Sequence, residues 1–368
     1  MYLLIKPASG ACNLRCKYCF YADEMKNREI PARAMLTPAL FDVILDRAFA
    51  HLEQTGDRRL SIGFQGGEPT LVGLPFYEHA VSAVRKRKPA SVRVEYFIQT
   101  NGTQIDTAWA KFLKENRFLV GLSLDGTAEI HDQLRMDAPG KGTHRSVLRA
   151  AEILRRQGCE FNILTVITEE IARHPVKVYN YYKKLGFLYQ QYIPCISPLD
   201  GEALPFALSS EDYGKFLCTL FDLWYKDVLA GAQIYHREFE NYIGILLGRY
   251  PEECGMIGRC SVQYLIESDG SVYPCDFYAL DAYLLGNVTT DDFATLDARR
   301  TELQFIERSA ALPDECMTCP YGILCRGGCY RNRDENGRNR FCSAYRALFA
   351  YALPRMQQLA RIVAQQRG

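Results

Sequence analysis

Three cysteines near the N-terminus, Cys12, Cys16 and Cys19 in the run ACNLRCKYCFY, carry the clearest chemical signal in the chain. Their spacing of four and then three residues allows one loop to direct three thiolates at a single point. Thiolates are the ligands of iron–sulfur clusters and of zinc. A [4Fe–4S] cluster with three protein ligands keeps one iron open for a small molecule. A structural zinc loop is the alternative, although zinc needs a fourth ligand and commonly uses CxxC pairs.

A second group of cysteines lies near the C-terminus, where eight of the fourteen fall between residues 254 and 342. Residues 316–329 have the spacing CxxCxxxxxCxxxC. Eight thiolates can ligate two cubane clusters completely, and two zinc sites fit the same spacing. Crowding at both ends of the chain indicates metal ligands in a reducing compartment rather than disulfides. Cys159, Cys195 and Cys218 lie in helix or strand patterns, and we expect them to be buried, inert thiols.

Polar residues also follow two of the predicted strands. The GGEP segment at 66–69 has two glycines that let the backbone approach a ligand, and Glu68 with nearby carbonyls offers acceptors to an ammonium group. Ser123 and Asp125 end a later strand, and Arg135 follows them. A hydroxyl and a guanidinium at this place could bind a carboxylate or a ribose, although Arg135 could instead form a surface ion pair.

Asp276 follows Cys275 directly in PCDFY. A carboxylate beside a cluster ligand suits a general base that works next to an electron acceptor. The alternative is an aspartate that caps a turn after the preceding hairpin. That hairpin is predicted from YLIESDGSVYP, whose Asp-Gly turn brings Cys275 back towards Cys260.

The elements that must position these residues form an α/β pattern. Strand-like apolar runs occur at residues 3–6, 60–65, 92–100, 118–125, 161–168 and 188–195. Helix-like stretches lie between them at 37–54, 74–88, 106–116, 144–158 and 174–186. Six such units predict a parallel sheet closed into a partial (β/α)6 TIM-like barrel, with its chemistry at the carboxyl ends of the strands.

The rest of the chain divides by composition. Residues 1–200 form the predicted barrel, and 201–253 form a helical bridge with helices near 210–229 and 236–248. The cysteine-rich domain spans 254–342, and residues 343–368 hold a terminal helix up to about 366.

Composition excludes several classes of function. Hydrophobic residues at 48% and charged residues at 24% are ordinary for a globular protein. A net charge of +1 gives no basic surface for nucleic acid or for an anionic membrane. No apolar run approaches the roughly 20 residues of a membrane span, and the N-terminus lacks the features of a signal peptide. We therefore expect a cytoplasmic protein.

The motifs resemble those of known radical enzymes. CxxxCxxC, with Tyr18 before its last cysteine, resembles the signature of radical S-adenosylmethionine (SAM) enzymes, and the C-terminal spacing resembles their SPASM extension. FQGGEPTL, CGMIGRC and IESDGSVYPCDFY extend the resemblance over the whole chain to the anaerobic sulfatase-maturating enzymes. That resemblance implies S-adenosylmethionine and three [4Fe–4S] clusters as cofactors. The implied ligands are Cys12, Cys16 and Cys19 for the first cluster, Cys254, Cys260, Cys275 and Cys329 for one auxiliary cluster, and Cys316, Cys319, Cys325 and Cys342 for the other. The implied contacts to S-adenosylmethionine are Tyr18, Gly66, Gly67, Glu68, Ser123, Asp125 and Arg135.

The resemblance also implies a reaction, the oxidation of a sulfatase cysteine or serine to Cα-formylglycine. A 5′-deoxyadenosyl radical takes a hydrogen from the substrate Cβ, Asp276 removes the thiol or hydroxyl proton, and an electron leaves through the auxiliary clusters. Tyr21 and Gln65 are the expected substrate contacts. The expected partners are a sulfatase segment of the Cys/Ser-x-Pro-x-Arg type and an electron donor such as flavodoxin or ferredoxin.

Two alternatives remain at this point. A maturase that forms a thioether or carbon–carbon crosslink in a ribosomally made peptide would use the same machinery, but many such enzymes have a leader-binding domain. Only eleven residues precede Cys12, so we expect that domain to be absent. A ferredoxin-like carrier or a zinc-stabilised binding protein would explain the C-terminal cysteines but not GGEP or the barrel. Iron analysis separates them, with about twelve irons per chain for three cubanes.

Overall fold

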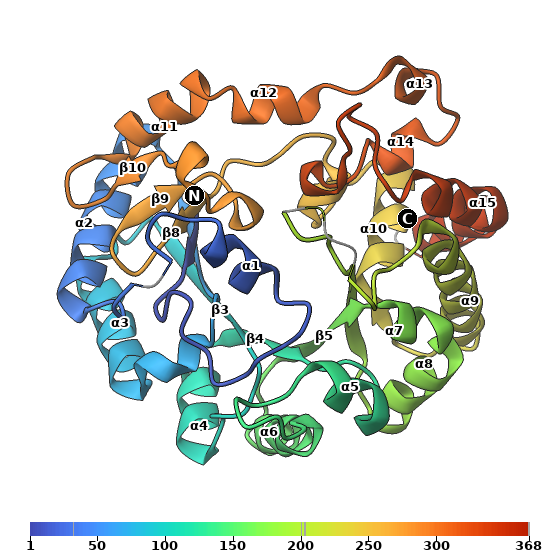
Figure 1. Ribbon diagram of the computed structural model, residues 1–368, viewed down its shortest axis with the longest axis horizontal. Helices are drawn as coiled ribbons and strands as arrows, with labels where there is room; N and C mark the ends of the chain where they lie inside the picture. The colour runs from blue at the N-terminus through green and yellow to red at the C-terminus, as the bar shows by residue number, and fades with distance from the viewer. Residues whose placement is uncertain (32, 200, 202–203, 367–368) are drawn as a thin grey trace.

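One sheet of ten strands runs through the protein in the order β10-β9-β8-β1-β2-β3-β4-β5-β6-β7 (Figure 1). The strands are β1 (Tyr2–Ile5), β2 (Arg59–Phe64), β3 (Arg93–Thr100), β4 (Phe118–Ser123), β5 (Phe161–Ile167), β6 (Tyr189–Pro194), β7 (Tyr235–His236), β8 (Tyr264–Ile266), β9 (Ser271–Tyr273) and β10 (Gly286–Asn287). Neighbours from β8 to β7 pair in parallel, whereas β9 and β10 pair antiparallel. The six predicted strands are present as β1–β6, and the predicted α/β fold is confirmed.

The coordinates are a computed structural model that describes residues 1–31, 33–199, 201 and 204–366. The predicted boundary at residue 200, residues 202–203 of the predicted bridge and residues 367–368 of the terminal segment lie outside these ranges. Within the described ranges, no helix combines the length and the hydropathy needed to cross a membrane.

Helices surround the sheet, and most of the longer ones lie on its outer face (Figure 1). They are α1 (Phe20–Lys26), α2 (Pro38–Thr55), α3 (Leu74–Arg87), α4 (Thr107–Glu115), α5 (Ala128–Leu134), α6 (His144–Arg156), α7 (Glu169–Arg173), α8 (Pro175–Lys184), α9 (Ser210–Leu229), α10 (Arg237–Leu246), α11 (Phe293–Glu302), α12 (Phe305–Ala310), α13 (Asp314–Met317), α14 (Gly322–Cys325) and α15 (Cys342–Gln365). Short 3₁₀ turns are η1 (Pro69–Val72), η2 (Cys254–Met256), η3 (Asp276–Tyr278), η4 (Asp281–Tyr283) and η5 (Tyr330–Asn332). Every predicted helix is present. The helices α1, α5, α7 and α12–α14 were not predicted because they are too short to show a helical period, and α11 was not predicted either.

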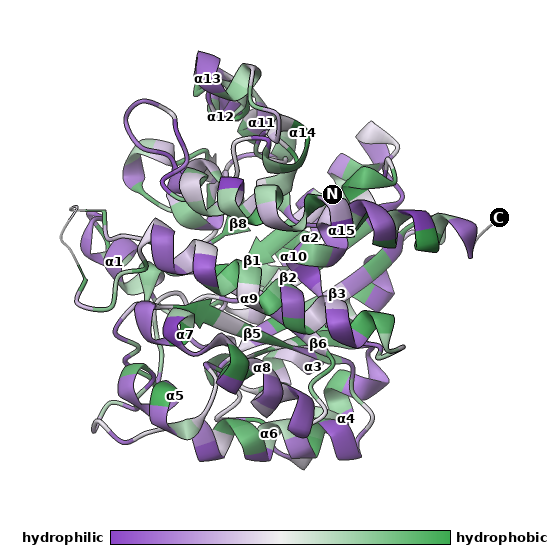
Figure 2. Ribbon diagram, turned by 90° about the vertical axis from the view of Figure 1, so that its right-hand side faces the viewer, coloured by the Kyte–Doolittle hydropathy of each residue, from purple (hydrophilic) through white to green (hydrophobic). Residues whose placement is uncertain are grey.

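The long helices begin and end where the residue types require. Thr37 caps α2 by accepting the Leu40 N–H at 3.2 Å, and Gly56 ends that helix with a φ of 74°. Hydrophobic and hydrophilic residues alternate along the outer helices (Figure 2), as expected for helices with one face on a sheet. Phe41 of α2 and Phe64 of β2 pack together in the resulting core with ring centroids 6.3 Å apart.

The C-terminal part of the chain closes the open side of the barrel. Its first strand, β8, pairs in parallel with β1, and β9 returns antiparallel as the predicted Asp-Gly hairpin. From there α11 and α12 run across to α13 and α14, which lie on the side of α10 and α15 (Figure 1). The cysteine-rich segment therefore starts beside β1 and ends near the last strands, facing the carboxyl ends of the barrel strands.

The predicted helical bridge contains α9 and α10, as expected, and also one strand. Tyr235 and His236 form β7, which extends the sheet by pairing with β6. A strand of two residues has no alternation that sequence patterns could detect, so the bridge is not purely helical.

Candidate active site

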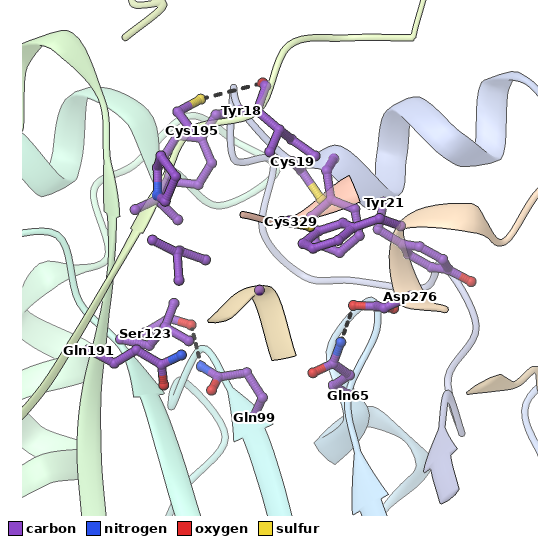
Figure 3. Close-up of a pocket in the computed structure, with 18 of the residues that line it drawn as sticks. Tyr18, Cys19, Tyr21, Gln65, Gln99, Ser123, Gln191, Cys195, Asp276 and Cys329 are labelled. Carbon is purple, nitrogen blue, oxygen red and sulfur yellow. Dashed lines mark hydrogen bonds between the residues drawn. The ribbon is translucent and has the colours of Figure 1, made fainter. Parts of the chain in front are cut away.

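A cavity of about 460 Å³ lies at the carboxyl ends of the strands (Figure 3). The cysteine loop after β1 contributes Cys12, Cys16 and Cys19 to its wall, and the C-terminal segment contributes Asp276 and Cys329. The two motif regions predicted from the sequence therefore meet at one cavity, and three predicted cluster ligands line it together with the predicted general base.

Asp276 is held from two sides at this cavity. Lys6 Nζ lies 2.6 Å from Asp276 Oδ1, and Gln65 donates from Nε2 to Asp276 Oδ2 (Figure 3). Lys6 and Gln65 directly follow β1 and β2, which are neighbouring parallel strands, so their side chains emerge together. The carboxyl side chain keeps 12% of its surface exposed, which leaves it open to the cavity.

A buried ionic layer supports that wall. The Tyr21 ring lines the cavity, but its hydroxyl points away and donates to Glu267, the residue directly after β8. Arg28 also pairs with Glu267, at 2.8 Å. Burial tends to raise the pKa of Glu267, but the charges of Lys6 and Arg28 bring it below its ordinary value. Burial raises the pKa of the neighbouring Glu24 to about 8. The attraction of nearby cations therefore outweighs the effect of burial at Glu267 but not at Glu24.

The opposite wall holds a second polar set. Tyr18 donates its hydroxyl proton to Asp125 Oδ2 and accepts from Arg135 Nη1 at 2.8 Å. Asp125 Oδ1 accepts the Val166 N–H at 3.0 Å, and Arg135 Nη1 lies 3.8 Å from Asp125 Oδ2. Tyr18 and Arg135 line the cavity, whereas Asp125 is fully buried behind them. Asp125 therefore supports a ligand site through its neighbours rather than by contact.

Ser123 ends β4 and lines the same wall, where its Oγ accepts from Gln99 Nε2 at 3.0 Å (Figure 3). Asn101 follows β3 and donates from Nδ2 to Cys12 Sγ at 3.9 Å, a contact that steadies the cysteine loop. Gln99 and Asn101 were not predicted. They stand at the carboxyl end of β3 in QTNG, so the strand-end rule that selected Ser123 also applies to them.

The GGEP segment packs tightly against the cysteine loop. The Glu68 carboxylate is fully buried and accepts from Thr70 N, Thr70 Oγ1, Thr100 Oγ1 and Asn101 N at 2.6–3.1 Å. With its oxygens used inside the protein, the backbone carbonyls of the segment are what remains to bind an ammonium group. A Cβ on Gly67 would come within 2.2 Å of Ala11 O, so only glycine fits there.

A second cavity, of about 140 Å³, is bordered by all four cysteines that were predicted to share one auxiliary cluster. They are Cys254, Cys260, Cys275 and Cys329. Burial and the neighbouring thiols raise the pKa of Cys254 and of Cys329 to about 11 and raise that of Cys275 further. Thiols with raised pKa values form thiolates only beside a strongly cationic group such as iron.

The other predicted set also gathers in space. Burial raises the pKa of Cys325 to about 11, and Cys342, Cys316 and Cys319 lie close enough to affect it. In the described ranges, no three Cys, His, Asp or Glu side chains surround one point closely enough to hold a single metal ion. All fourteen cysteines are free thiols.

Similarity to known proteins identifies the family of this chain. Residues 7–181 match the Radical SAM superfamily, and residues 254–320 match the SPASM iron–sulfur cluster-binding domain. The chain is 44% identical to a cysteine-type anaerobic sulfatase-maturating enzyme of Clostridium novyi, over 98% of each chain. The chain belongs to the anaerobic sulfatase-maturating enzymes. It is 31% identical to a serine-type member of Klebsiella pneumoniae, over 98% of this chain and 89% of that one.

A solved structure of this family has the same fold. Native anSMEcpe with bound AdoMet and Cp18Cys peptide superposes with a TM-score of 0.91 at 41% identity, covering 98% of this chain and 99% of that chain. As a radical SAM enzyme with a SPASM domain, the present enzyme uses S-adenosylmethionine and three [4Fe–4S] clusters. The thiol sets fit this requirement, because three face the central cavity and four surround the second one.

Not every predicted site residue of this sulfatase-maturating enzyme faces the central cavity. Asp125 lies behind the wall, and five of the auxiliary cysteines lie away from it. These five are Cys260, Cys275, Cys316, Cys319 and Cys342. Of the three cysteines expected to be inert, Cys159 and Cys195 are buried and Cys218 is only half-buried. Cys195 lines the central cavity, which the sequence did not indicate.

Proposed function

We propose that this enzyme oxidises a cysteine side chain of a sulfatase segment to Cα-formylglycine, with Asp276 as the proton acceptor. The position of Asp276 carries the proposal, because its carboxyl group lines the same cavity as the N-terminal cysteine loop and three of the auxiliary-cluster cysteines. Greater identity to the cysteine-type relative than to the serine-type relative supports cysteine over serine as the target.

The reaction removes a hydrogen atom, a proton and an electron from the substrate side chain. When bound, S-adenosylmethionine and its cluster supply abstraction of a hydrogen atom from Cβ, and the auxiliary clusters accept one electron. Asp276 takes the thiol proton, so that –CH₂–SH becomes –CH=S. Water then replaces sulfur, releasing hydrogen sulfide and leaving the aldehyde.

Other residues bind and orient the cofactor and the substrate. Backbone carbonyls at Gly66, Gly67 and Glu68 offer acceptors to the amino group of S-adenosylmethionine. Arg135 and Ser123 offer donors to its carboxylate or ribose, and Tyr18 fixes Arg135. Gln65 contacts the substrate while it orients Asp276, and Tyr21 presents its ring to the substrate side of the cavity.

The eleven cysteines predicted as ligands keep their assignments in this proposal. Cys12, Cys16 and Cys19 hold the first cluster. Cys254, Cys260, Cys275 and Cys329 hold one auxiliary cluster, and Cys316, Cys319, Cys325 and Cys342 hold the other. The cavity bordered by the first auxiliary set supports that grouping. The division at residues 1–200, 201–253, 254–342 and 343–368 is likewise retained as a proposal.

For its partners, we propose a Cys-x-Pro-x-Arg type segment as substrate and a flavodoxin or ferredoxin as electron donor. Free thiols throughout the chain support a reducing, cytoplasmic location.

The test is an anaerobic reaction of the iron-loaded enzyme with S-adenosylmethionine, a reductant and a Cys-x-Pro-x-Arg peptide, with a serine peptide in parallel. Mass spectrometry should find the aldehyde in the cysteine peptide, matched by 5′-deoxyadenosine, and little product from serine. Deoxyadenosine without any aldehyde would contradict the substrate assignment and point to crosslink formation in another peptide. Equal rates on both peptides would contradict the preference for cysteine.

A further inference from the structure

Lys6 is a fully buried cation that contacts Asp276 behind the wall of the active-site cavity, and no sequence motif indicated it. We propose that Lys6 is a positioning residue, which fixes Asp276 Oδ1 while Gln65 fixes Oδ2, so that the carboxylate faces the substrate thiol. This inference rests on the proposed role of Asp276 as the proton acceptor.

The backbone places Lys6 firmly. It directly follows β1, and its N–H donates to Ile266 O of β8 at 2.9 Å. The side chain then passes over Tyr21, with Nζ 3.5 Å from the ring centroid, and ends 2.6 Å from Asp276 Oδ1. Both strand pairing and a cation–π contact therefore aim the ammonium group at this oxygen.

Gly66 provides the space that this path requires. A Cβ at position 66 would come within 2.6 Å of Lys6 Cγ and 2.7 Å of Lys6 Cδ. The lysine stem therefore occupies the place of a side chain at position 66. Gly66, the first glycine of GGEP, thus makes room for the lysine side chain that contacts Asp276, and it also lets the backbone approach a ligand.

Lys6 also attracts Glu267 and Glu24 at longer range, but Asp276 is the carboxylate that it contacts directly. Arg28 is already paired with Glu267 at 2.8 Å, and Tyr21 donates to the same carboxylate. A pair built only for stability would be closed off, yet Asp276 lines the cavity while Lys6 has no exposed surface. Asp276 Oδ1 is enclosed beside Lys6, so the part of the carboxyl group that stays exposed is what can accept a proton from a ligand in the cavity.

Lys6 takes no part in the bond changes of the proposed step. In the proposed step the substrate S–H bond breaks and an O–H bond forms on Asp276, while the hydrogen atom from Cβ and one electron leave through the bound cofactors. Lys6 keeps its own protons throughout. Misplacement of the carboxylate should therefore slow the proton transfer and leave abstraction from Cβ intact.

The test replaces Lys6 by methionine, which has similar volume and no charge. Lys111→Met, on the exposed face of α4, is the matched control. Both variants are loaded with iron, and iron content, peptide affinity, 5′-deoxyadenosine and formylglycine are measured. For Lys6→Met we expect full iron and unchanged peptide affinity, with the ratio of formylglycine to deoxyadenosine lowered about tenfold or more. Lys111→Met should keep the ratio of the unchanged enzyme.

At full iron content, an unchanged ratio in Lys6→Met overturns the proposal, and so does a parallel loss of deoxyadenosine and product. Lys6→Gln provides a second variant because it keeps an N–H donor in the same space, and its ratio should fall between those of Lys6→Met and the unchanged enzyme. If Lys6→Met loads iron poorly, the ratio in Lys6→Gln decides alone. Failure of the proposed function is distinguishable, because the unchanged enzyme would then make no formylglycine.

Discussion

Each wall of the central cavity pairs an aspartate with a cationic side chain, but the two pairs serve different purposes. One wall has Asp276 with Lys6, and the other has Asp125 with Arg135 and Tyr18. Asp276 remains partly exposed to the cavity. Asp125 has no exposed surface, and its two oxygens accept hydrogen bonds from the Tyr18 hydroxyl and the Val166 N–H. An accessible carboxylate can exchange a proton, and an enclosed one can only hold its neighbours. Exposure to the cavity, rather than residue type, therefore decides which aspartate can react with a substrate and which one supports the structure.

The largest expected effect comes from Asp276→Asn. An amide cannot accept the thiol proton as a carboxylate does, so formylglycine should fall about a thousandfold while 5′-deoxyadenosine is still made. Both products are measured in the same anaerobic reaction, with Asp46→Asn, an exposed partner of Arg87, as control. Formylglycine that falls no more than deoxyadenosine would remove the distinction between the walls.

Asp125→Asn should impair the enzyme in a different way, by weakening the fold and the cofactor site. One acceptor oxygen becomes an NH₂ group, and Arg135 is left as a buried cation without a charged partner, at a cost of about 3 kcal/mol. We expect a lower midpoint of thermal unfolding and weaker binding of S-adenosylmethionine, with deoxyadenosine and formylglycine reduced in parallel. A selective loss of formylglycine would instead give Asp125 a chemical role.

Glu24→Gln tests the charge balance behind Asp276. Burial raises the Glu24 pKa from 4.5 to about 8, so the folded state holds this proton more tightly than the unfolded state does. Stability contributed at low pH is therefore lost as pH rises from 4.5 towards 8, by about 2 kcal/mol between pH 5 and 7. Glutamine should remove that loss, which anaerobic thermal unfolding at several pH values will reveal. Exposed Glu211→Gln is the control, and an identical slope in both variants would mean that Glu24 is charged when folded.

Tyr18→Phe should have the smallest effect. It removes the hydroxyl that joins Arg135 to Asp125 while their charges remain 3.8 Å apart, so about 1 kcal/mol should be lost. The affinity for S-adenosylmethionine should fall a few-fold by anaerobic titration, with the ratio of formylglycine to deoxyadenosine preserved. A changed ratio would place the hydroxyl in the chemistry.

Much of this site could be predicted because its residues stand in local patterns. The spacing of Cys12, Cys16 and Cys19 and the step from Cys275 to Asp276 are visible in a few consecutive letters. The long helices were equally visible, because their period persists over several turns.

What escaped prediction depends on contacts between distant segments. Lys6 and Asp276 are 270 positions apart and meet only because β8 pairs with β1. A lysine at the end of a strand resembles an ordinary surface residue until that pairing buries it. The enclosure of Asp125 likewise follows from the packing of Tyr18 and Arg135 over it, which no local pattern encodes.

Because β8 pairs in parallel with β1, the N-terminal cysteine loop and the C-terminal cysteine-rich segment depend on each other for their structure. The register that joins Leu3 to Tyr264 and Ile5 to Ile266 also sets how far Cys275 stands from the N-terminal cysteine loop. Cutting the chain before residue 254 would strip β1 of a partner and expose an apolar edge prone to association. A working chimera between relatives must therefore exchange β1 and the β8–β9 hairpin together.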